Sequence, residues 1–320
     1  MAERLARRGV NPDRILSSPV LCVNVAGASR AKIESPNKPA KDLPRRRPTV
    51  PLPRTRVATW NVNSIKARSQ VVARWLNAER PDLLLIQETK CTDQAFPRSE
   101  FADLGYRIET VGQKSYNGVG ILSRAPLAVE WRRLPDDSED NEARYIEAVV
   151  ELPIAGKRKR QGLRVASLYL PNGNPAGSDS FLYKIDCMMR LISHARRLLK
   201  EPEPVILGGD FNVAPTDADV YDPSLFGNDA LCRPETRARF RELLALGFTD
   251  AIAANHPGAG NYTFWDYQDR AFPKNHGWRI DHLLLSDRVL PLLVDCGIDK
   301  QPRSAAKPSD HVPVWCDLRL

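Results

Sequence analysis

The chain has 320 residues, of which 42% are hydrophobic, so it can bury a sizeable core. Its six cysteines are scattered without a CxxC pair, which argues against a zinc ribbon or a disulfide framework and favours reduced thiols in the cytoplasm. No apolar run approaches the roughly 20 residues of a membrane span. The Arg-rich start lacks the apolar stretch of a secretory signal, although an organelle presequence stays open there.

The net charge of +8 is concentrated in one segment. Residues 1–54 hold 12 Lys and Arg but only 4 Asp and Glu, which leaves 35 of each kind for residues 55–320. Because this segment is also rich in Pro and has little to bury, we expect a disordered basic extension. Three interpretations stay open: it binds nucleic acid without sequence preference, it serves as a passive linker, or it reflects a misassigned start codon. The neutral remainder makes net charge weak support for DNA binding by the folded part.

Beyond residue 54, strand-like and helix-like patterns alternate. In chain order, we expect strands over residues 56–61, 81–88, 117–124, 144–153, 163–171, 204–210, 262–267, 278–286 and 311–318, and helices over 64–79, 180–200 and 234–247. Ser64 is a candidate N-cap of the first helix, and Gly247 ends the third. Residues 155–162 are expected to form a charged turn. This mixture predicts one α/β domain over residues 55–320 with mixed sheets.

Seven polar residues border these strands. Four stand at strand ends and three at or before strand starts: Asn61, Glu88, Tyr169 and Asp210 at the ends, and Asp281, Asp310 and His311 at the starts. If the last strands run antiparallel to the earlier ones, all seven side chains converge on one sheet edge. Loops at sheet ends are where α/β enzymes usually place their sites.

The residue types suggest a chemistry. Glu88 and Asp310, with Asn61 nearby, are hard oxygen ligands that suit Mg²⁺. Asp210 and Asn212 would orient or activate a water. Asp281 and His311 would form a carboxylate–imidazole pair that stabilises negative charge on a phosphate. No Ser or Cys stands in a nucleophile-elbow context, so the pattern predicts metal-assisted hydrolysis of a phosphoester by water.

Plainer interpretations exist for several of these residues. Asp210 and Asn212 fit a strand-end turn, and a lone Glu88 fits an exposed strand end. Asp281 has a neighbouring partner in Arg279. His194, on a helix among Arg residues, is expected at the surface. The cluster of Asp217, Asp219 and Asp222 is expected to be a polar loop, since it lacks the Gly and Glu of a calcium loop.

Taken together, seven segments in order resemble the exonuclease III/apurinic–apyrimidinic endonuclease family, within the endonuclease/exonuclease/phosphatase superfamily. The resemblance runs from Thr55 to Leu320 and rests on TWNVNSIKAR, PDLLLIQETK, NGVGILSR, LYLPNGN, GGDFNVAP, WRIDHLLLS and KPSDHVPVW. It implies a four-layer α/β sandwich, with two packed mixed sheets flanked by helices. It also implies a monomeric DNA-repair phosphodiesterase that uses Mg²⁺, with Mn²⁺ as a substitute, cuts duplex DNA 5′ to abasic sites and trims 3′ ends.

The resemblance also implies residue roles. Glu88 matches the metal-binding glutamate, and the residues around the metal are Asn61, Asn63, Asp210, Asn212, Asp310 and His311. Tyr169 and Asn172 match residues that contact the scissile phosphate, and Asp210 with Asn212 matches the pair that positions the attacking water. Asp281 and His311 match the carboxylate–histidine pair. Arg144 and Asn63 match residues on the DNA side.

Three aromatic residues bear on the substrate. Phe264, Trp265 and Trp278 match positions where the DNA-repair branch builds its pocket for an abasic sugar, and the alternative is that they belong to the core. Two other functions stay open. One is a superfamily phosphatase that acts on a small phosphoester or a phospholipid, and the other is a catalytically inactive protein that binds nucleic acid.

Overall fold

The computed structural model describes residues 54–136, 139–154 and 160–320. The predicted basic extension, apart from its last residue, lies outside the described residues, so its disorder stays a prediction. Residues 155–159 of the predicted charged turn lie outside them as well. Among the helices that are described, none has the length and apolar character needed to cross a membrane.

The described residues form two six-stranded sheets. In the first sheet the order is β11 (Leu293–Ile298), β12 (Val314–Leu318), β1 (Thr55–Asn61), β2 (Leu83–Gln87), β4 (Val119–Ser123) and β3 (Arg107–Val111). In the second it is β5 (Leu127–Trp131), β6 (Tyr145–Pro153), β7 (Arg160–Tyr169), β8 (Val205–Asp210), β10 (Asp281–Ser286) and β9 (Phe248–Asp250). The pairs β1–β2 and β7–β8 are parallel, and their other neighbours pair antiparallel.

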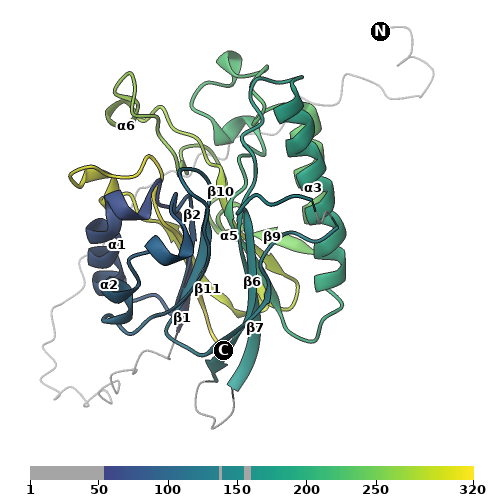
Figure 1. Ribbon diagram of the computed structural model, residues 1–320. Helices are drawn as coiled ribbons and strands as arrows, with labels where there is room; N and C mark the ends of the chain where they lie inside the picture. The colour runs from purple at the N-terminus through teal and green to yellow at the C-terminus, as the bar shows by residue number, and fades with distance from the viewer. Residues whose placement is uncertain (1–53, 137–138, 155–159) are drawn as a thin grey trace, which may run out of the picture. The chain divides into compact units, whose positions relative to one another are not determined.

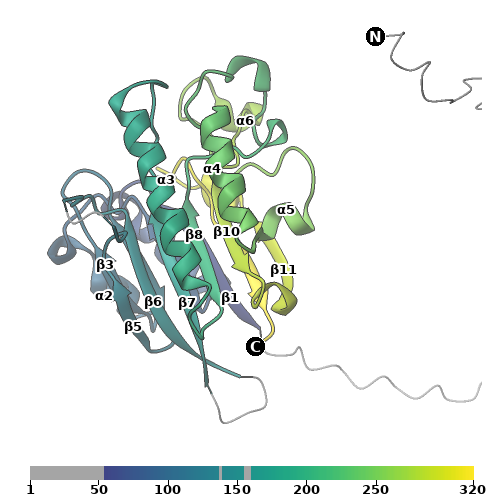
Figure 2. The same ribbon diagram turned by 90° about the vertical axis from the view of Figure 1, so that its right-hand side faces the viewer.

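The two sheets pack face to face and helices cover their outer faces (Figures 1 and 2). Helices α1 (Ile65–Glu79) and α2 (Arg98–Ala102) lie on the first sheet, and α3 (Asp179–Leu198) and α4 (Pro234–Ala245) lie on the second. Two shorter helices, α5 (Ala251–Asn255) and α6 (Ala271–Lys274), stand in loops. The expected four-layer α/β sandwich is therefore confirmed.

Strand periodicity explains the layering. Leu83 and Leu85 of β2 point into the core between the sheets, while Leu84 and Ile86 point outward against α1. Both faces are buried, which is why this strand reads as a continuous apolar run. The N-terminus of α3 is capped by Ser178, whose hydroxyl accepts a hydrogen bond from the Phe181 N–H.

Several sequence-based expectations were wrong in detail. Ser64 precedes α1, but its side chain makes no capping hydrogen bond. The segment 262–267 is not a strand; within it, Phe264 makes only isolated bridges, to Trp278 and to His311. His194 is buried rather than exposed, and its Nε2 lies 2.7 Å from Glu147 Oε2. Asp219 is also buried, so its part of the acidic cluster is not a solvated loop.

The strands that the sequence did not reveal share one property. They are β3, β5, β9 and β11, the strands at the two ends of each sheet. Edge strands have one unpaired side, and β3, β5 and β11 bury at most one residue each, so they lack the apolar runs that mark central strands. The burial of β5, with two of its five residues half-buried and three exposed, shows this pattern. Strand β9 is only three residues long.

Candidate active site

The strand directions bring the seven border residues to one edge. In the parallel pairs, β1 ends at Asn61 beside the end of β2, and β7 ends at Tyr169 beside Asp210. The antiparallel strand β10 starts at Asp281, directly opposite Asp210. Strand β12 runs antiparallel to β1, which places the segment before it at the same edge. The convergence expected from the sequence is therefore present.

Asn61 joins the two central carboxylates. Its Nδ2 donates hydrogen bonds to Glu88 Oε1 at 2.7 Å and to Asp210 Oδ2 at 2.9 Å. Ligand atoms of Glu88, Asp210 and His311 all lie within 4.8 Å of one another. The Glu88 side chain is only 14% exposed, so it is not the solvated strand end of the plainer interpretation. Two converging carboxylates are hard oxygen donors that fit a divalent cation, whereas the Asn61 oxygen accepts a hydrogen bond from the Asn63 N–H.

The protonation of the two carboxylates differs. Burial raises the pKa of Asp210, the positive charge on His311 lowers it, and the neighbouring Asp281 and Glu88 raise it. The net result is a pKa of about 7. Burial also acts to raise the pKa of Glu88, but Lys90, whose Nζ lies 2.7 Å from Glu88 Oε2, and the Asn61 hydrogen bond outweigh it and lower the pKa. Glu88 is therefore a stable anion, whereas Asp210 exchanges a proton near neutral pH.

Asp281 and His311 form the expected pair. His311 Nδ1 lies 2.8 Å from Asp281 Oδ2, which also accepts a hydrogen bond of 2.6 Å from Thr263 Oγ1. Burial acts to lower the pKa of His311, but the carboxylates of Asp281 and Asp210 outweigh it and raise the pKa to about 10. A protonated ring has no free lone pair, so His311 suits contact with an anion better than metal ligation.

Within the described residues, Arg279 makes no ion pair with Asp281. Arg279 pairs instead with Asp219, at 2.7 Å, and with Asp250.

Asn212 is held in place from several sides. Its backbone N–H donates to Asp210 Oδ1 at 2.9 Å, and its Nδ2 donates to the Leu170 carbonyl at 2.9 Å. Asn172 Nδ2 lies 3.3 Å from Asn212 Oδ1. The φ of Asn212 is +50°, a left-handed conformation that Asn tolerates better than most residues. The stretch is thus a strand-end turn, as the plainer interpretation holds, and that turn builds the site.

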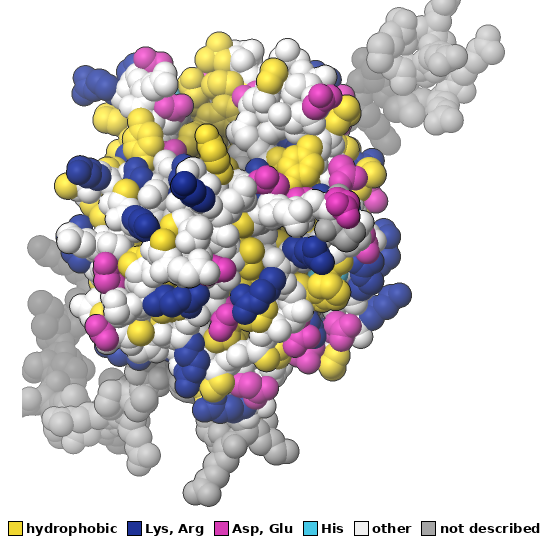
Figure 3. All heavy atoms as spheres, viewed as in Figure 1, with side chains coloured by type: hydrophobic (Ala, Val, Ile, Leu, Met, Phe, Trp, Pro, Cys, Tyr) yellow, Lys and Arg dark blue, Asp and Glu magenta, His cyan; other side chains and the backbone are white. Residues whose placement is uncertain are grey.

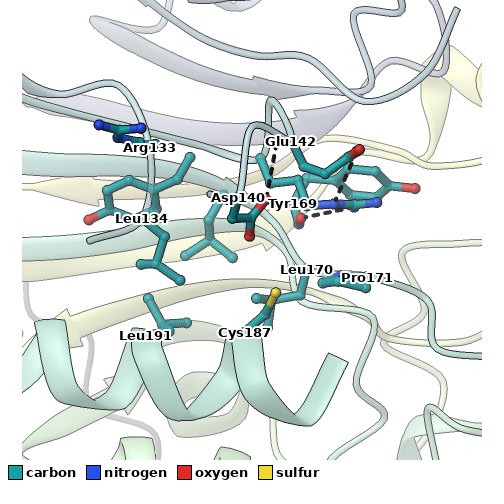
Figure 4. Close-up of a pocket in the computed structure, with 12 residues that line it drawn as sticks. Arg133, Leu134, Asp140, Glu142, Tyr169, Leu170, Pro171, Cys187 and Leu191 are labelled. Atoms are coloured by element: carbon teal, nitrogen blue, oxygen red, sulfur yellow. Dashed lines mark hydrogen bonds and ion pairs between the residues drawn. The ribbon is translucent and has the colours of Figure 1, made fainter. Parts of the chain in front are cut away.

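Tyr169 and Arg144 lie together next to the carboxylates. The Arg144 guanidinium carbon is 4.9 Å from the centre of the Tyr169 ring. Burial and the charges of Glu88 and Asp210 raise the pKa of Tyr169 well above its usual value, so it remains a neutral hydroxyl. Behind this pair, a cavity of about 20 Å³ reaches Cys187 of α3 (Figure 4). It has room for about one water molecule.

A second group of residues borders the carboxylates. Asn63 Nδ2 donates to Asp310 Oδ1 at 3.0 Å, and Lys90 Nζ donates to Asn63 Oδ1. Sequence reasoning missed Lys90, although its place two residues after Glu88 in the QETK segment was a usable signal. It also missed Tyr267, whose hydroxyl lies 3.4 Å from Asn63 Nδ2.

Two of the three aromatic residues line a cavity. Phe264 and Trp278 lie on the wall of a hollow of about 580 Å³, which Figure 3 shows in the upper part of the view with hydrophobic side chains in it. The Phe264 ring is centred 4.9 Å from the His311 ring, so this hollow adjoins the site. Trp278 is also packed, with its ring centre 4.4 Å from that of Phe226. Trp265 is fully buried and belongs to the core.

Comparisons with known proteins agree with this geometry. The Endonuclease/Exonuclease/phosphatase family model matches residues 58–311. Exodeoxyribonuclease III of Haemophilus influenzae is 30% identical over 269 residues, which cover 82% of this chain and 98% of that protein. An AP endonuclease from Archaeoglobus fulgidus superposes with a TM-score of 0.77 at 33% identity, covering 83% of this chain and 100% of that chain. A 3′-5′ exonuclease from Neisseria meningitidis gives a TM-score of 0.78 at 35% identity, with coverage of 83% and 100%. The chain therefore belongs to the endonuclease/exonuclease/phosphatase family, as a metal-dependent phosphodiesterase nuclease of the exonuclease III/AP endonuclease type.

Proposed function

We propose that this protein cuts duplex DNA on the 5′ side of abasic sites, leaving a 3′-hydroxyl, and also trims 3′ ends, with Mg²⁺ as its metal and Mn²⁺ as a substitute. The observation that carries the proposal is the hollow that adjoins His311 through Phe264 and has the Phe264 and Trp278 rings on its wall. The matched relatives support both halves of it, since one is an AP endonuclease and another is a 3′-5′ exonuclease.

In this proposal Glu88 is the main metal ligand, and Asp210 and Asp310 supply further oxygens. Asn61, which the family resemblance places around the metal, orients the Glu88 and Asp210 carboxylates through its Nδ2. A bound Mg²⁺ would act as a Lewis acid that stabilises negative charge on the phosphate. Asn212 is a further candidate ligand through its amide oxygen. His311, which the sequence pattern also offers as a ligand, acts instead as a protonated ring.

The hydrolytic step follows from the protonation states. Asp210 orients the attacking water and accepts its proton, because burial and the neighbouring carboxylates raise its pKa above that of an ordinary carboxylate and so make it a stronger base. Asn212 holds the water or a phosphate oxygen through its side-chain amide. The His311 ring, oriented by Asp281, donates to a phosphate oxygen on which negative charge develops.

The remaining site residues bind the DNA. The Tyr169 hydroxyl and the Asn172 amide donate to oxygens of the scissile phosphate. Arg144 and Asn63 contact the backbone next to it. Phe264 and Trp278, on the wall of the hollow, accept a deoxyribose without a base that has turned out of the duplex. Their rings are proposed to select it against a nucleotide that carries its base.

The proposal extends to the oligomeric state, the compartment and the partner of the protein. We infer a monomeric enzyme of the cytoplasm that acts on double-stranded DNA. The five cysteines in the described part of the chain are buried and form no disulfide, which suits a reducing compartment. The basic segment 1–54 would add DNA affinity that falls as salt rises, without a part in the chemistry.

A gel assay tests the function. Purified protein is incubated with a duplex that carries one abasic site, with the same duplex undamaged, and with an inositol phosphate, each with Mg²⁺ or EDTA. We expect Mg²⁺-dependent incision 5′ to the abasic site and slow loss of 3′ ends from the undamaged duplex. Phosphate release from the inositol phosphate without DNA cleavage would identify a phosphatase. No turnover of any substrate would identify an inactive binder.

Glu88→Gln is the matched variant for the metal assignment. A neutral amide keeps the hydrogen bond from Asn61 but binds Mg²⁺ poorly, so the variant should fold normally and lose most activity. Near-normal turnover at low Mg²⁺ would exclude Glu88 as the main ligand.

A further inference from the structure

Lys184 is a buried lysine beneath the site. It lies in the second turn of α3, and its side chain is fully buried. Its Nζ donates to three backbone carbonyls, those of Pro171 at 3.0 Å, Asn172 at 3.1 Å and Asn212 at 2.6 Å. None of the ion pairs found within the described ranges includes Lys184. A buried ammonium that is held by carbonyl oxygens rather than by a carboxylate is uncommon, because burying a charge is costly without strong partners.

The three carbonyls belong to two different loops. Pro171 and Asn172 follow β7, whereas Asn212 follows β8. Both loops carry site residues, and the Asn172 and Asn212 side chains contact each other at 3.3 Å. Figure 4 shows the start of the first loop, Leu170 and Pro171, lying over α3. The lysine therefore joins the helix and both loops at one nitrogen atom.

The surrounding backbone is shaped to admit this side chain. Gly173 has a φ of +84°, and a Cβ built on it would lie 2.6 Å from Lys184 Cδ. Only a glycine leaves room there for the lysine stem. Asn212, on the other loop, is held in the left-handed region at φ +50°. A conformation of this kind persists only when surrounding contacts hold it.

We propose that Lys184 is a positioning residue that sets the placement of Asn172 and Asn212 against Asp210, so that the water and the phosphate meet in the reactive geometry. This inference rests on the proposed roles of Asn172 and Asn212. Lys184 does not touch the substrate in this account. It acts through the two loops, and its removal lets the Asn212 turn relax.

The test is Lys184→Met, which keeps the length and apolar stem of the side chain and removes the three hydrogen bonds. Because misplacement of reacting groups by about 1 Å costs up to roughly a hundredfold in rate, we expect kcat to fall about 10- to 100-fold. KM should stay within a factor of about three, since DNA binding by other residues is retained. The matched control is His194→Met, which removes another buried polar side chain from the same helix, about 15 Å further along. It should lower the melting temperature while leaving kcat near the wild-type value.

A double-mutant cycle separates positioning from a general structural role. In an Asn212→Ala background, Lys184→Met should cost less kcat than in the wild type, because one of the two residues through which it acts is gone. If Lys184→Met does not fold, Gly173→Ala presses on the lysine from the other side and should give the same loss of kcat. Full additivity with Asn212→Ala, or a kcat loss equalled by His194→Met, would overturn the inference.

These measurements are made on whichever phosphodiester the wild-type protein cleaves. If the wild type degrades 3′ ends but does not cut at abasic sites, the proposed substrate fails while the Lys184 test still stands. If the wild type cuts abasic DNA and Lys184→Met matches it in kcat, the positioning inference alone fails.

Discussion

Two neighbouring residues of β10, Asp281 and His282, each belong to a buried aspartate–histidine pair, but only the first pair lies at the candidate active site. Asp281 points between the sheets, where its Oδ2 lies 2.8 Å from His311 Nδ1. His282 points to the outer face, where its Nδ1 lies 2.8 Å from Asp250 Oδ2. The two contacts have the same atoms, the same distance and nearly complete burial. Pair geometry alone therefore does not identify a catalytic histidine.

The charged groups beside each pair distinguish the two pairs. Beside Asp250 and His282 stands Arg279, which contacts both of them and also pairs with Asp219. Burial acts to raise the pKa of Asp250, but Arg279 and His282 outweigh it and lower the pKa. This network is satisfied on all sides, since the other ring nitrogen of His282 faces the Val213 carbonyl at 3.1 Å.

The pair at the site has further carboxylates beside it rather than an arginine. Asp210 lies 3.7 Å from His311 Nε2, and Glu88 stands next to Asp210. Within the described residues, Asp281 Oδ1 is buried without a hydrogen-bond partner. The site thus keeps an excess of negative charge, which costs stability and favours a cation. A polar cluster that is left short of partners is a better sign of function than burial or pairing.

The largest expected effect comes from Asp210→Asn. Loss of the group that accepts the water proton should lower kcat by roughly 10²- to 10⁴-fold. The melting temperature should stay the same or rise, because repulsion from Asp281 and Glu88 is removed. Single-turnover rates and thermal melting of the same preparation measure both quantities. A large drop in melting temperature would show that Asp210 belongs with the structural pair.

Asp250→Asn should show the opposite behaviour. Breaking a buried ion pair from one side should lower the free energy of unfolding by ~3 kcal/mol, with little change in kcat of the folded enzyme. The Asp250 pKa is lowered by folding, so its stabilisation is present at neutral pH and is lost as pH falls through the folded-state pKa. Urea unfolding should therefore show a gap between variant and wild type at pH 7 that narrows in acid. A gap that is constant with pH would contradict this.

Phe264→Ala tests the substrate side of the comparison. Discrimination by shape is worth on the order of 1–3 kcal/mol per contact, so preference for abasic over intact duplex should fall about ten- to hundredfold. Trp278→Ala should add a loss of melting temperature, because Trp278 also packs against Phe226. The values of kcat/KM on both duplexes decide the matter. A uniform loss of activity with a large melting shift in both variants would mean that both rings are core.

The smallest effect at neutral pH is expected from Asp281→Asn, and it grows with pH. The protonated ring of His311 is lost as pH rises through its pKa of about 10, so wild-type activity should decline only at high pH. Without the Asp281 charge that pKa falls, and the decline should begin at a lower pH. Profiles of kcat/KM from pH 6 to 10 show the shift. Superimposable profiles would mean that ionisation of His311 does not control activity, and a profile that rises with pH would mean that His311 acts in its neutral form.

The central strands and the polar residues at their ends could be predicted from the sequence, for physical reasons. Central strands such as β2 are buried on both faces, so their apolar runs are plain, and polar residues that interrupt them stand out. The edge strands leave no comparable signal. The roles of His194, Asp219 and Lys184 depend on partners that are remote in the sequence, such as the Glu147 carboxylate for His194. Lys184 is the clearest case, because its three hydrogen-bond acceptors are backbone carbonyls, and no pattern of side chains in the sequence indicates them.

The alternation of Asp281 and His282 also affects the register in which β10 pairs with its neighbouring strands during folding. Side chains on a strand alternate between faces, so a slip of one residue would exchange the two. Asp281 would then meet Asp250, a buried carboxylate, and His282 would be drawn from the Arg279 network into the layer between the sheets. The apolar run Leu283–Leu285 that follows is nearly uniform and would tolerate such a slip. The two neighbouring polar residues thus specify the register of β10, because a pairing that is shifted by one residue would bury both of them without their partners.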